Sequence, residues 1–237
     1  MRIFGLQKLS MVDYPGKLSA TVFTGGCDLR CPFCHNALLV TRLAESPVLT
    51  EGAVLDFLKR RQGLLDGVVL SGGEPLLQAD AGDFLGAVRQ LGFAVKLDTN
   101  GFHPRALAKI LNQGLLDYVA MDIKNRREKY GVTCGIPDLD PAPVEESLRL
   151  LAGSGVDFEL RTTLVRNFHT PEDLAAMGQW VASFFPAGET PRYFLQKFVD
   201  SGNLISAGCT GFDDREMAAM AEKIRPFLPR TELRGVE

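Results

Sequence analysis

The chain has 237 residues, 46% of them hydrophobic and 23% charged, which suits one α/β domain with a sizeable core. A net charge of −3 gives no electrostatic reason to bind nucleic acid or an anionic membrane, and no apolar stretch approaches the roughly 20 residues of a membrane-spanning helix. Five cysteines, an odd number with three clustered, do not suggest a secreted disulfide framework, so we expect a reducing cytoplasm.

The predicted elements alternate along the chain. The opening segment ends in a Pro15-Gly16 turn, and an apolar, β-branched strand follows over 18–24. Further strands are predicted over 67–71, 93–98, 118–124, 158–165 and 193–198. Helices are predicted over 50–61 (with Thr50 as N-cap), 79–91, 104–114, 143–153, 171–183 and 213–227, and residues 230–234 are expected to form a short tail.

Six strands alternating with six helices imply right-handed crossovers and a parallel sheet. Six units are two short of a closed eight-fold barrel, so an open partial barrel and a flat doubly wound sheet both fit. With no linker or low-complexity tract, residues 1–237 are expected to form one domain. Polar residues at or just past the strand ends would meet at one rim: Glu74, Asp98, Asn100, Asp122, Lys124, Arg161, Gln196 and Lys197.

Three cysteines follow the first predicted strand with the spacing C-x3-C-x2-C: Cys27, Cys31 and Cys34. Converging thiolates repel one another and need a cation or a metal cluster. Structural zinc would need a fourth ligand, and His35 directly follows Cys34, which makes a shared small ion difficult. A four-iron cluster held by three thiolates would leave one iron open to an outside ligand. The spacing favours the cluster and leaves zinc as an alternative.

The cysteine spacing, with Phe33 between the last two cysteines, resembles the radical S-adenosylmethionine (SAM) superfamily. Its second hallmark is matched by Gly72-Gly73-Glu74-Pro75 at the end of the second predicted strand. The resemblance covers essentially the whole chain and implies a partial (β/α)6 TIM-like barrel. It also implies a [4Fe-4S] cluster on the three cysteines, with the amino and carboxylate groups of SAM on the open iron. Reductive cleavage of SAM would then give methionine and a 5′-deoxyadenosyl radical.

The same resemblance assigns roles to the second hallmark. Gly72 and Gly73 would let the backbone approach the amino group of SAM, and Glu74 would accept a hydrogen bond from that group or brace the loop. The alternative for paired glycines is an ordinary strand-to-helix turn.

Asp98-Thr99-Asn100-Gly101 resembles the Asp-Thr-Asn-Gly stretch of glycyl-radical-enzyme activators, so Asp98 and Asn100 are expected to contact the cofactor or a cation. The alternative is an Asx-type turn. Asp122 and Lys124 resemble the Asp-x-Lys strand end of those enzymes, with a structural ion pair as the alternative. In some relatives the two aspartates hold a monovalent cation, which the resemblance extends to Asp98 and Asp122.

Two more residues receive roles from the resemblance. Arg161 would face the carboxylate or ribose of SAM, since a guanidinium suits a carboxylate, and a salt bridge at the edge of the core is the alternative. His169 would lie near the adenosyl group. We expect His103 to be a surface residue at a helix start and His35 to shape the cysteine loop.

Cys134 and Cys209 are far from the cysteine loop in sequence. They are interpreted as unpaired thiols whose replacement should change little.

The opening Gln7-Lys8-x-Ser10-x-Val12-Asp13-Tyr14-Pro15-Gly16 and the short Cys-Pro-Phe-Cys-His-Asn loop resemble activating enzymes, in particular those of anaerobic ribonucleoside-triphosphate reductase. This implies a glycyl radical enzyme as protein substrate and a flavodoxin or ferredoxin as electron donor. Three alternatives stay open: a pyruvate formate-lyase-type activase, an enzyme for a small metabolite similar to the queuosine-precursor synthases, and a non-enzymatic zinc-loop interaction protein.

Overall fold

The computed structural model describes residues 1–45 and 48–236, and the chain divides into two compact units. Unit 1 comprises Met1–Asp28 and Asn36–Ala120, and unit 2 comprises Leu29–His35 and the chain from Met121 onward. Within each unit the paired strands follow one another in chain order.

The core of unit 1 is a set of neighbouring strands. β1 (Ile3–Ser10) runs antiparallel to β2 (Ser19–Thr24), and β2, β3 (Gly67–Gly72) and β4 (Ala94–Thr99) are parallel. The unit also contains α1 (Ala37–Thr41), α2 (Glu51–Lys59), α3 (Ala81–Gln90), α4 (Pro104–Asn112) and two short 3-10 turns, Leu43–Glu45 and Pro75–Leu77. β5 (Tyr118–Asp122) begins in unit 1 and ends in unit 2.

Local sequence explains these elements. The predicted N-cap is confirmed, because the side chain of Thr50 accepts a hydrogen bond from the Ala53 backbone at 3.2 Å at the start of α2. On α3, Phe84, Leu85 and Val88 are completely buried at helical spacing. The paired register ends with Thr24 opposite Gly72, so the loops that leave β2 and β3 start side by side.

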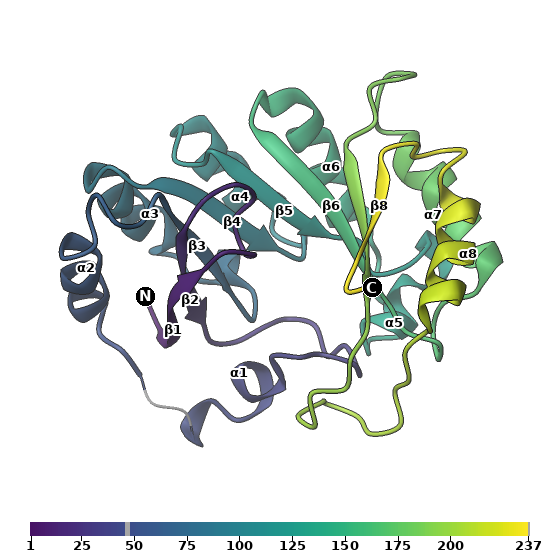
Figure 1. The fold of residues 1–237 in the computed structure, drawn as a ribbon, viewed down its shortest axis with the longest axis horizontal. Helices are drawn as coiled ribbons and strands as arrows, with labels where there is room; N and C mark the ends of the chain where they lie inside the picture. Colours follow the sequence, from purple (N-terminus) through teal and green to yellow (C-terminus); the bar gives the residue numbers. More distant parts are fainter. Residues whose placement is uncertain (46–47, 237) are drawn as a thin grey trace. The chain divides into compact units, whose positions relative to one another are not determined.

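Unit 2 also carries parallel strands: β6 (Asp157–Leu164), β7 (Arg192–Lys197) and β8 (Thr231–Arg234). Its helices are α5 (Tyr130–Thr133), α6 (Ala142–Ser154), α7 (Pro171–Ala182) and α8 (Asp214–Ile224), with a 3-10 turn at Arg127–Lys129. α7 and α8 lie against each other (Figure 1). Each begins with a reciprocal capping box, on Thr170 and Asp213 respectively.

The six predicted strands and six predicted helices all occur, with boundaries that differ by a few residues. The count of six strands was too low, because the described chain has eight. The opening segment forms β1, whose exposed middle carries Gln7 and Lys8 and lacks an apolar run. The predicted tail forms β8, which has only four residues and two charged side chains. Both strands lack the local pattern by which the other six were found.

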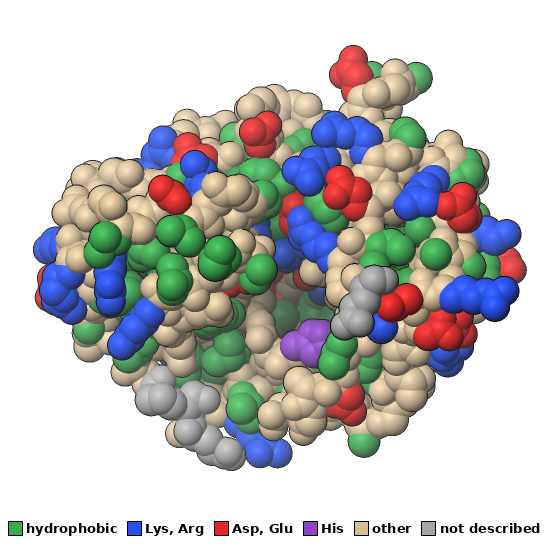
Figure 2. Space-filling view, in the orientation of Figure 1, with side chains coloured by type: hydrophobic (Ala, Val, Ile, Leu, Met, Phe, Trp, Pro, Cys, Tyr) green, Lys and Arg blue, Asp and Glu red, His purple; other side chains and the backbone are tan. Residues whose placement is uncertain are grey.

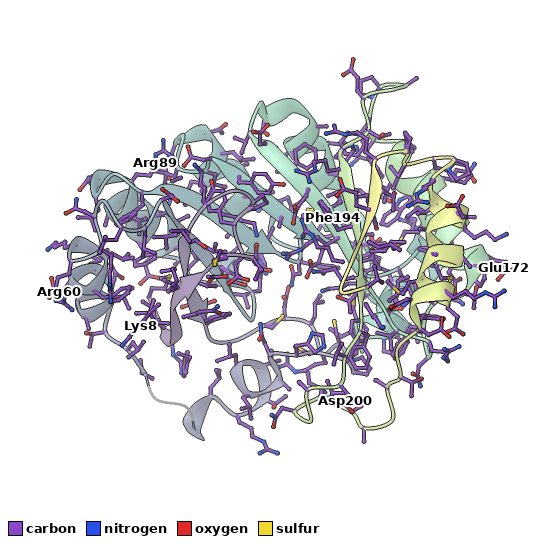
Figure 3. All side chains as sticks on the ribbon, viewed as in Figure 1. Lys8, Arg60, Arg89, Glu172, Phe194 and Asp200 are labelled. Atoms are coloured by element: carbon purple, nitrogen blue, oxygen red, sulfur yellow. The ribbon has the colours of Figure 1, made fainter. Side chains whose placement is uncertain are left out.

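Among the described residues, no helix is long and apolar enough to cross a membrane. Acidic and basic side chains are interspersed over the face shown in Figure 2, in keeping with the net charge of −3. Arg60, Arg89 and Glu172 are among the charged residues at the outer surface (Figure 3).

Candidate functional site

The loops that follow β2 and β3 are joined backbone to backbone in unit 1. The Gly73 amide donates to the Thr24 carbonyl at 3.0 Å, and the Glu74 amide donates to the Gly26 carbonyl at 2.8 Å. A Cβ on Gly73 would lie 2.0 Å from the Gly26 oxygen, and one on Gly72, whose φ is +130°, would lie 2.3 Å from the Thr24 backbone. The glycines are therefore required where the second hallmark contacts the start of the cysteine loop.

The residue that follows the cysteines is fastened to the same place. Asn36 donates from Nδ2 to the Gly72 carbonyl at 2.7 Å, and the Gly26 amide donates to the Leu39 carbonyl at 2.8 Å. Both ends of the cysteine loop are thus held by the backbone at the end of β3. The expected approach of Gly72 and Gly73 to SAM stays a prediction, and their contact with the cysteine loop is what the structure shows.

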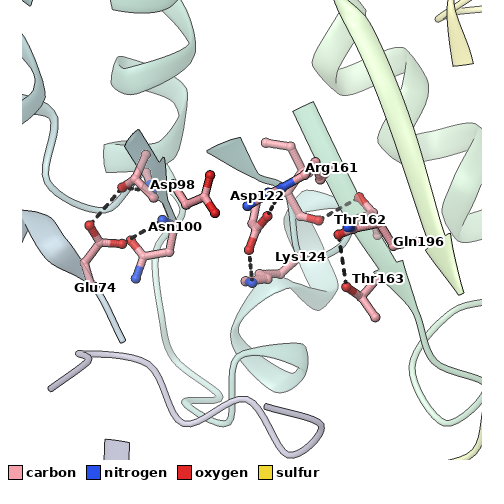
Figure 4. Close-up of polar contacts among 12 residues, drawn as sticks. Glu74, Asp98, Asn100, Asp122, Lys124, Arg161, Thr162, Thr163 and Gln196 are labelled. Carbon is pink, nitrogen blue, oxygen red and sulfur yellow. Dashed lines mark hydrogen bonds and ion pairs between the residues drawn. The ribbon is translucent and has the colours of Figure 1, made fainter. Parts of the chain in front are cut away.

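Glu74 is completely buried and braces the adjoining loop (Figure 4). Its carboxylate accepts hydrogen bonds from the Leu76 amide at 2.9 Å, the Thr99 hydroxyl at 2.9 Å and the Asn100 amide at 2.7 Å. Burial raises the pKa of Glu74 to about 7, and the three donors act against that rise. Of its two predicted roles the structure shows the bracing one, and a contact with the cofactor stays a prediction.

Asn100 links this brace to the cysteine loop. Its Nδ2 donates to Oδ1 of Asp28 at 2.9 Å and lies 3.8 Å from the sulfur of Cys27. Its backbone amide holds Glu74, as described above. One residue of the Asp-Thr-Asn-Gly stretch therefore contacts both hallmarks of the predicted site.

His103, which lies at a helix start as expected, also belongs to this group. It stands at the N-cap position of α4, and its Nε2 lies 3.1 Å from Oδ2 of Asp28. The hydrogen bond to Asp28 raises the pKa of His103. Burial opposes ionisation of Asp28, but hydrogen bonds from His103 and Asn100 lower its pKa overall. No local pattern in the sequence indicates this pair, because its members are far apart along the chain.

Asp98, labelled in Figure 4, contacts Lys96 on its own strand and Ser71 on the neighbouring strand β3. Oδ1 lies 2.8 Å from Nζ of Lys96, and Oδ2 accepts a hydrogen bond from the Ser71 hydroxyl at 3.2 Å. The carboxylate of Asp98 is thus paired with an ammonium. The expected contact of Asp98 with a cofactor or cation stays a prediction.

Asp122, Lys124 and Arg161 form an ion-pair group in unit 2 (Figure 4). Lys124 Nζ lies 2.9 Å from Oδ2 of Asp122, and Arg161 Nε lies 2.9 Å from Oδ1. Burial opposes ionisation of Asp122, but the two cations lower its pKa to about 2. The structural ion pair, which was the alternative for these three residues, is present, and their predicted contacts with SAM are untested.

His169 is held by the backbone of unit 2. Only 2% of the residue is exposed, Nδ1 accepts from the Val165 amide at 3.1 Å, and Nε2 lies 2.8 Å from the Lys124 carbonyl. Nδ1 also lies 3.1 Å from the Val165 carbonyl, and burial lowers the pKa of His169. Both ring nitrogens contact the protein backbone, so His169 helps to hold the segments around Val165 and Lys124 together. The predicted contact with the adenosyl group stays a prediction.

The last two predicted rim residues lie on β7. Gln196 accepts a hydrogen bond from the Thr163 hydroxyl at 3.5 Å. Lys197 lies 2.5 Å from Oδ1 of Asp214, the first residue of α8. Lys197 therefore fastens a helix to its strand.

The cysteine segment of unit 2 packs on the turn after α5. The Arg30 amide donates to the Cys134 carbonyl at 2.9 Å, and the side chain of Cys134 hydrogen-bonds Cys31. That bond and the ammonium of Lys124 lower the pKa of Cys31, against the effect of burial. Cys134 is completely buried and in no disulfide, as expected of an unpaired thiol, but sequence distance gave no hint that its turn lies beside this cysteine segment.

His35 has contacts that suit the predicted role in shaping the loop. Its ring stacks on Phe198 with centroids 5.4 Å apart, and Nε2 lies 2.9 Å from the Val199 carbonyl. With that nitrogen bonded to the protein backbone, the histidine contributes to the loop's packing on unit 2.

The donor set suits a metal cluster, although neither unit alone contains all three cysteines. Cys27 belongs to unit 1, and Cys31 and Cys34 belong to unit 2. Within the described residues no group of three or more Cys, His, Asp or Glu side chains is placed to hold a metal ion. None of the described cysteines is in a disulfide, so the thiols have the chemical form that an iron–sulfur cluster requires. Their assignment as ligands rests on the sequence spacing.

Sequence comparison relates the chain to known proteins. The model of the radical SAM superfamily matches residues 21–181. A protein of Methanocaldococcus jannaschii that is named as a glycyl-radical enzyme activating enzyme is 35% identical over 201 residues, which cover 83% of this chain and 79% of that protein. The pyruvate formate-lyase-activating enzyme of Clostridium pasteurianum is 35% identical over 129 residues, 52% of each chain. The 7-carboxy-7-deazaguanine synthase of Hyperthermus butylicus is 36% identical over 92 residues, 38% of each chain.

Solved structures share the fold. Streptococcus suis SuiB bound to SAM has a TM-score of 0.67 at 14% identity over 90% of this chain, which spans only 49% of SuiB. Coproporphyrinogen III oxidase from Escherichia coli, a radical SAM enzyme, has a TM-score of 0.61 at 14% identity, covering 92% of this chain and 54% of the oxidase. The expected α/β fold of the partial-barrel class is confirmed. The chain therefore belongs to the radical SAM superfamily, whose cofactors are a [4Fe-4S] cluster and SAM, and is related to the glycyl-radical-enzyme activating enzymes.

Proposed function

We propose that this chain is an activase: it reductively cleaves SAM and generates a glycyl radical on a partner enzyme, anaerobic ribonucleoside-triphosphate reductase. The observation that carries the proposal is the 35% identity to the activating enzyme of M. jannaschii, which extends over 83% of this chain and 79% of the relative. The motifs of the opening segment support the choice of reductase, and a cytoplasmic location with a flavodoxin or ferredoxin as donor suits this chemistry.

When bound, the cluster would supply one electron to SAM, whose carbon–sulfur bond would break homolytically to give methionine and a 5′-deoxyadenosyl radical. The hydrogen atom taken from the glycine Cα ends on 5′-deoxyadenosine, and the unpaired electron stays on the glycine. The protein's part is to hold and orient. Cys27, Cys31 and Cys34 would hold the cluster, and Asn100 and Glu74 keep the surrounding loops in register.

Electron paramagnetic resonance tests the proposal. The anaerobically reconstituted protein is reduced and mixed with SAM and the reductase, and in parallel with SAM and pyruvate formate-lyase. We expect a glycyl doublet on the reductase, with one 5′-deoxyadenosine formed per radical. A doublet only on pyruvate formate-lyase would move the assignment to that partner, and no doublet on either would reject the activase.

A second candidate is an enzyme that acts on a small metabolite. The 36% identity to the H. butylicus synthase favours it, but this match extends over only 38% of each chain. The discriminating measurement is the release of 5′-deoxyadenosine. If release depends on a small-molecule fraction and is unaffected by the reductase, the metabolite enzyme is the better assignment.

A further inference from the structure

A buried lysine stands beside the first aspartate of the Asp-Thr-Asn-Gly stretch. Only 2% of Lys96 is exposed, and it lies two residues before Asp98 on β4, so both side chains leave the same face of the strand. The ammonium lies 2.8 Å from Oδ1 of Asp98 and donates to the Asp13 carbonyl at 2.5 Å.

The surroundings fix the ammonium in place. Asp13 belongs to the turn between β1 and β2, where the hydroxyl of Ser10 accepts hydrogen bonds from the amides of Val12 and Asp13 at 3.3 and 3.1 Å. The carboxylate of Asp13 in turn accepts a hydrogen bond from the Thr21 hydroxyl at 2.7 Å. The carbonyl that receives Lys96 is therefore part of a turn that is itself hydrogen-bonded to β2.

A metal cation at Asp98 would have to share a carboxylate with this ammonium. A buried charge needs a partner of opposite sign, and Asp98 is the carboxylate beside Lys96. A second cation on the same carboxylate would meet like-charge repulsion at short range, where the dielectric screening is weak.

The second aspartate shows the same arrangement within unit 2. Asp122 has Lys124 at 2.9 Å on one oxygen and Arg161 at 2.9 Å on the other. Each of the two carboxylates that some relatives use for a monovalent cation thus already has a cationic side chain in its own unit. The residues present do not fit an added metal cation.

We propose that the ammonium of Lys96 is the fixed counter-ion of Asp98 in place of a monovalent metal cation, so that SAM binding by this chain requires neither Na⁺ nor K⁺. The pair also positions the residues that follow, since Thr99 and Asn100 hold Glu74, and Asn100 reaches Cys27. Lys96 is accordingly a positioning residue. This inference concerns the family's SAM site and is independent of the partner enzyme.

The first measurement uses the reconstituted wild-type chain without any partner. The dissociation constant of SAM is determined by equilibrium dialysis in NaCl, KCl and choline chloride at equal ionic strength. We expect the three values to agree within about twofold. A SAM affinity about tenfold or more weaker in choline than in Na⁺ or K⁺ would overturn the proposal.

The second measurement uses Lys96→Met, which removes the ammonium and leaves Asp98 without it. We expect SAM affinity in choline to fall about tenfold, and Na⁺ or K⁺ to restore much of it by occupying the vacated position. The melting temperature of the SAM-free variant should rise with Na⁺ or K⁺ relative to choline, a readout that does not depend on activity. Unchanged SAM affinity of Lys96→Met in choline would contradict the proposal.

Two controls complete the design. Lys59→Met removes an exposed lysine that pairs with Asp56, and it should behave as the wild type in all three salts. The double variant Lys96→Met/Asp98→Asn removes both charges, so it should fold even if Lys96→Met does not. Its melting temperature should show no response to Na⁺ or K⁺, because the carboxylate that would bind the cation is gone. A response as large as that of Lys96→Met would reject Asp98 as the cation's ligand and with it the proposal.

Discussion

Asn100 shows how one side chain can serve two motifs. It was predicted as a cofactor contact, and in the structure its amide reaches Asp28 and lies near Cys27, while its backbone holds Glu74. A short amide side chain suits this place because it can donate to a carboxylate and a sulfur at once. The Asp-Thr-Asn-Gly stretch could be recognised in the sequence by its resemblance to glycyl-radical-enzyme activators. The contacts of Asn100 could not be predicted from the sequence.

The cluster ligands give the first prediction at this scale. Replacing any one of Cys27, Cys31 or Cys34 by alanine should abolish SAM cleavage, because three thiolates are needed to hold the cluster and leave one iron open. Iron analysis should show a loss from about four atoms per chain. A variant that retains 5′-deoxyadenosine release would overturn the ligand assignment.

The second prediction concerns Cys134. From the sequence its replacement was expected to change little, but its burial leads us to expect a loss of stability. Cys134→Ala should lower the free energy of unfolding by about 1–2 kcal/mol, because the thiol is completely buried and hydrogen-bonded to the thiol of Cys31. Urea denaturation of the SAM-free protein measures this. Cys209→Ala is the matched control, since its sulfur has only a 3.8 Å contact with the Ser206 carbonyl, and it should cost less than half as much. Equal losses of unfolding free energy in the two variants would contradict a stabilising role for the contact of Cys134 with Cys31.

At the scale of elements, α7 depends on a single buried carboxylate at its start. Asp173 completes the capping box with Thr170 and lies 2.7 Å from Arg126 and 2.6 Å from Lys129. Burial opposes its ionisation, but the hydrogen bonds to the two cations lower its pKa overall. The cap thereby fastens the helix to the turn before α5.

The direction of this shift sets a pH dependence. Ionised Asp173 stabilises the fold above its ordinary pKa of 3.8, and the contribution is lost as pH falls through the lower folded-state pKa. Asp173→Asn should therefore cost about 2 kcal/mol at neutral pH, with a smaller deficit near pH 3. Denaturant unfolding at both pH values measures it, with the exposed Asp138→Asn as control. A deficit that grows on acidification would show the sign to be wrong.

At the scale of the whole molecule, β8 near the end of the chain is a strand that was not among the six predicted from the sequence. β8 pairs with β7, and Arg234 forms two hydrogen bonds, at 2.7 and 2.8 Å, with Glu159 on β6. Glu159 is completely buried, and the same guanidinium lies 3.3 Å from the ring centre of Phe194 on β7. Arg234 on β8 thus supplies the cation for a carboxylate buried in unit 2.

This closure can be tested by one substitution. Arg234→Ala should lower the free energy of unfolding by about 3–5 kcal/mol, because it leaves the Glu159 carboxylate buried without its cation. Thermal and urea unfolding measure the loss, and Arg230→Ala, which removes an exposed arginine nearby in sequence, should change little. Adding Glu159→Gln to Arg234→Ala should recover part of the loss, since no unpaired charge then remains. No recovery would attribute the effect to packing on Phe194.

The sequence by itself determined the features that are written within short stretches. The alternation of apolar runs and amphipathic segments located six strands and six helices, and the cysteine spacing with Gly72-Gly73-Glu74-Pro75 identified the family. Such patterns are local, because a strand, a helix or a loop motif repeats over a few residues. Strands β1 and β8 were missed because they are short or polar and owe their pairing to neighbours.

Only the tertiary structure decided which side chains contact one another. His103 meets Asp28, Cys134 meets Cys31, and Glu159 meets Arg234, each across a long separation in the chain. Lys96 and Asp98 are close in sequence, yet their burial and the Asp13 carbonyl that completes their site depend on the turn between β1 and β2. The fold of the backbone determines which side chains lie close together. A local sequence pattern does not show which distant residues the fold brings into contact.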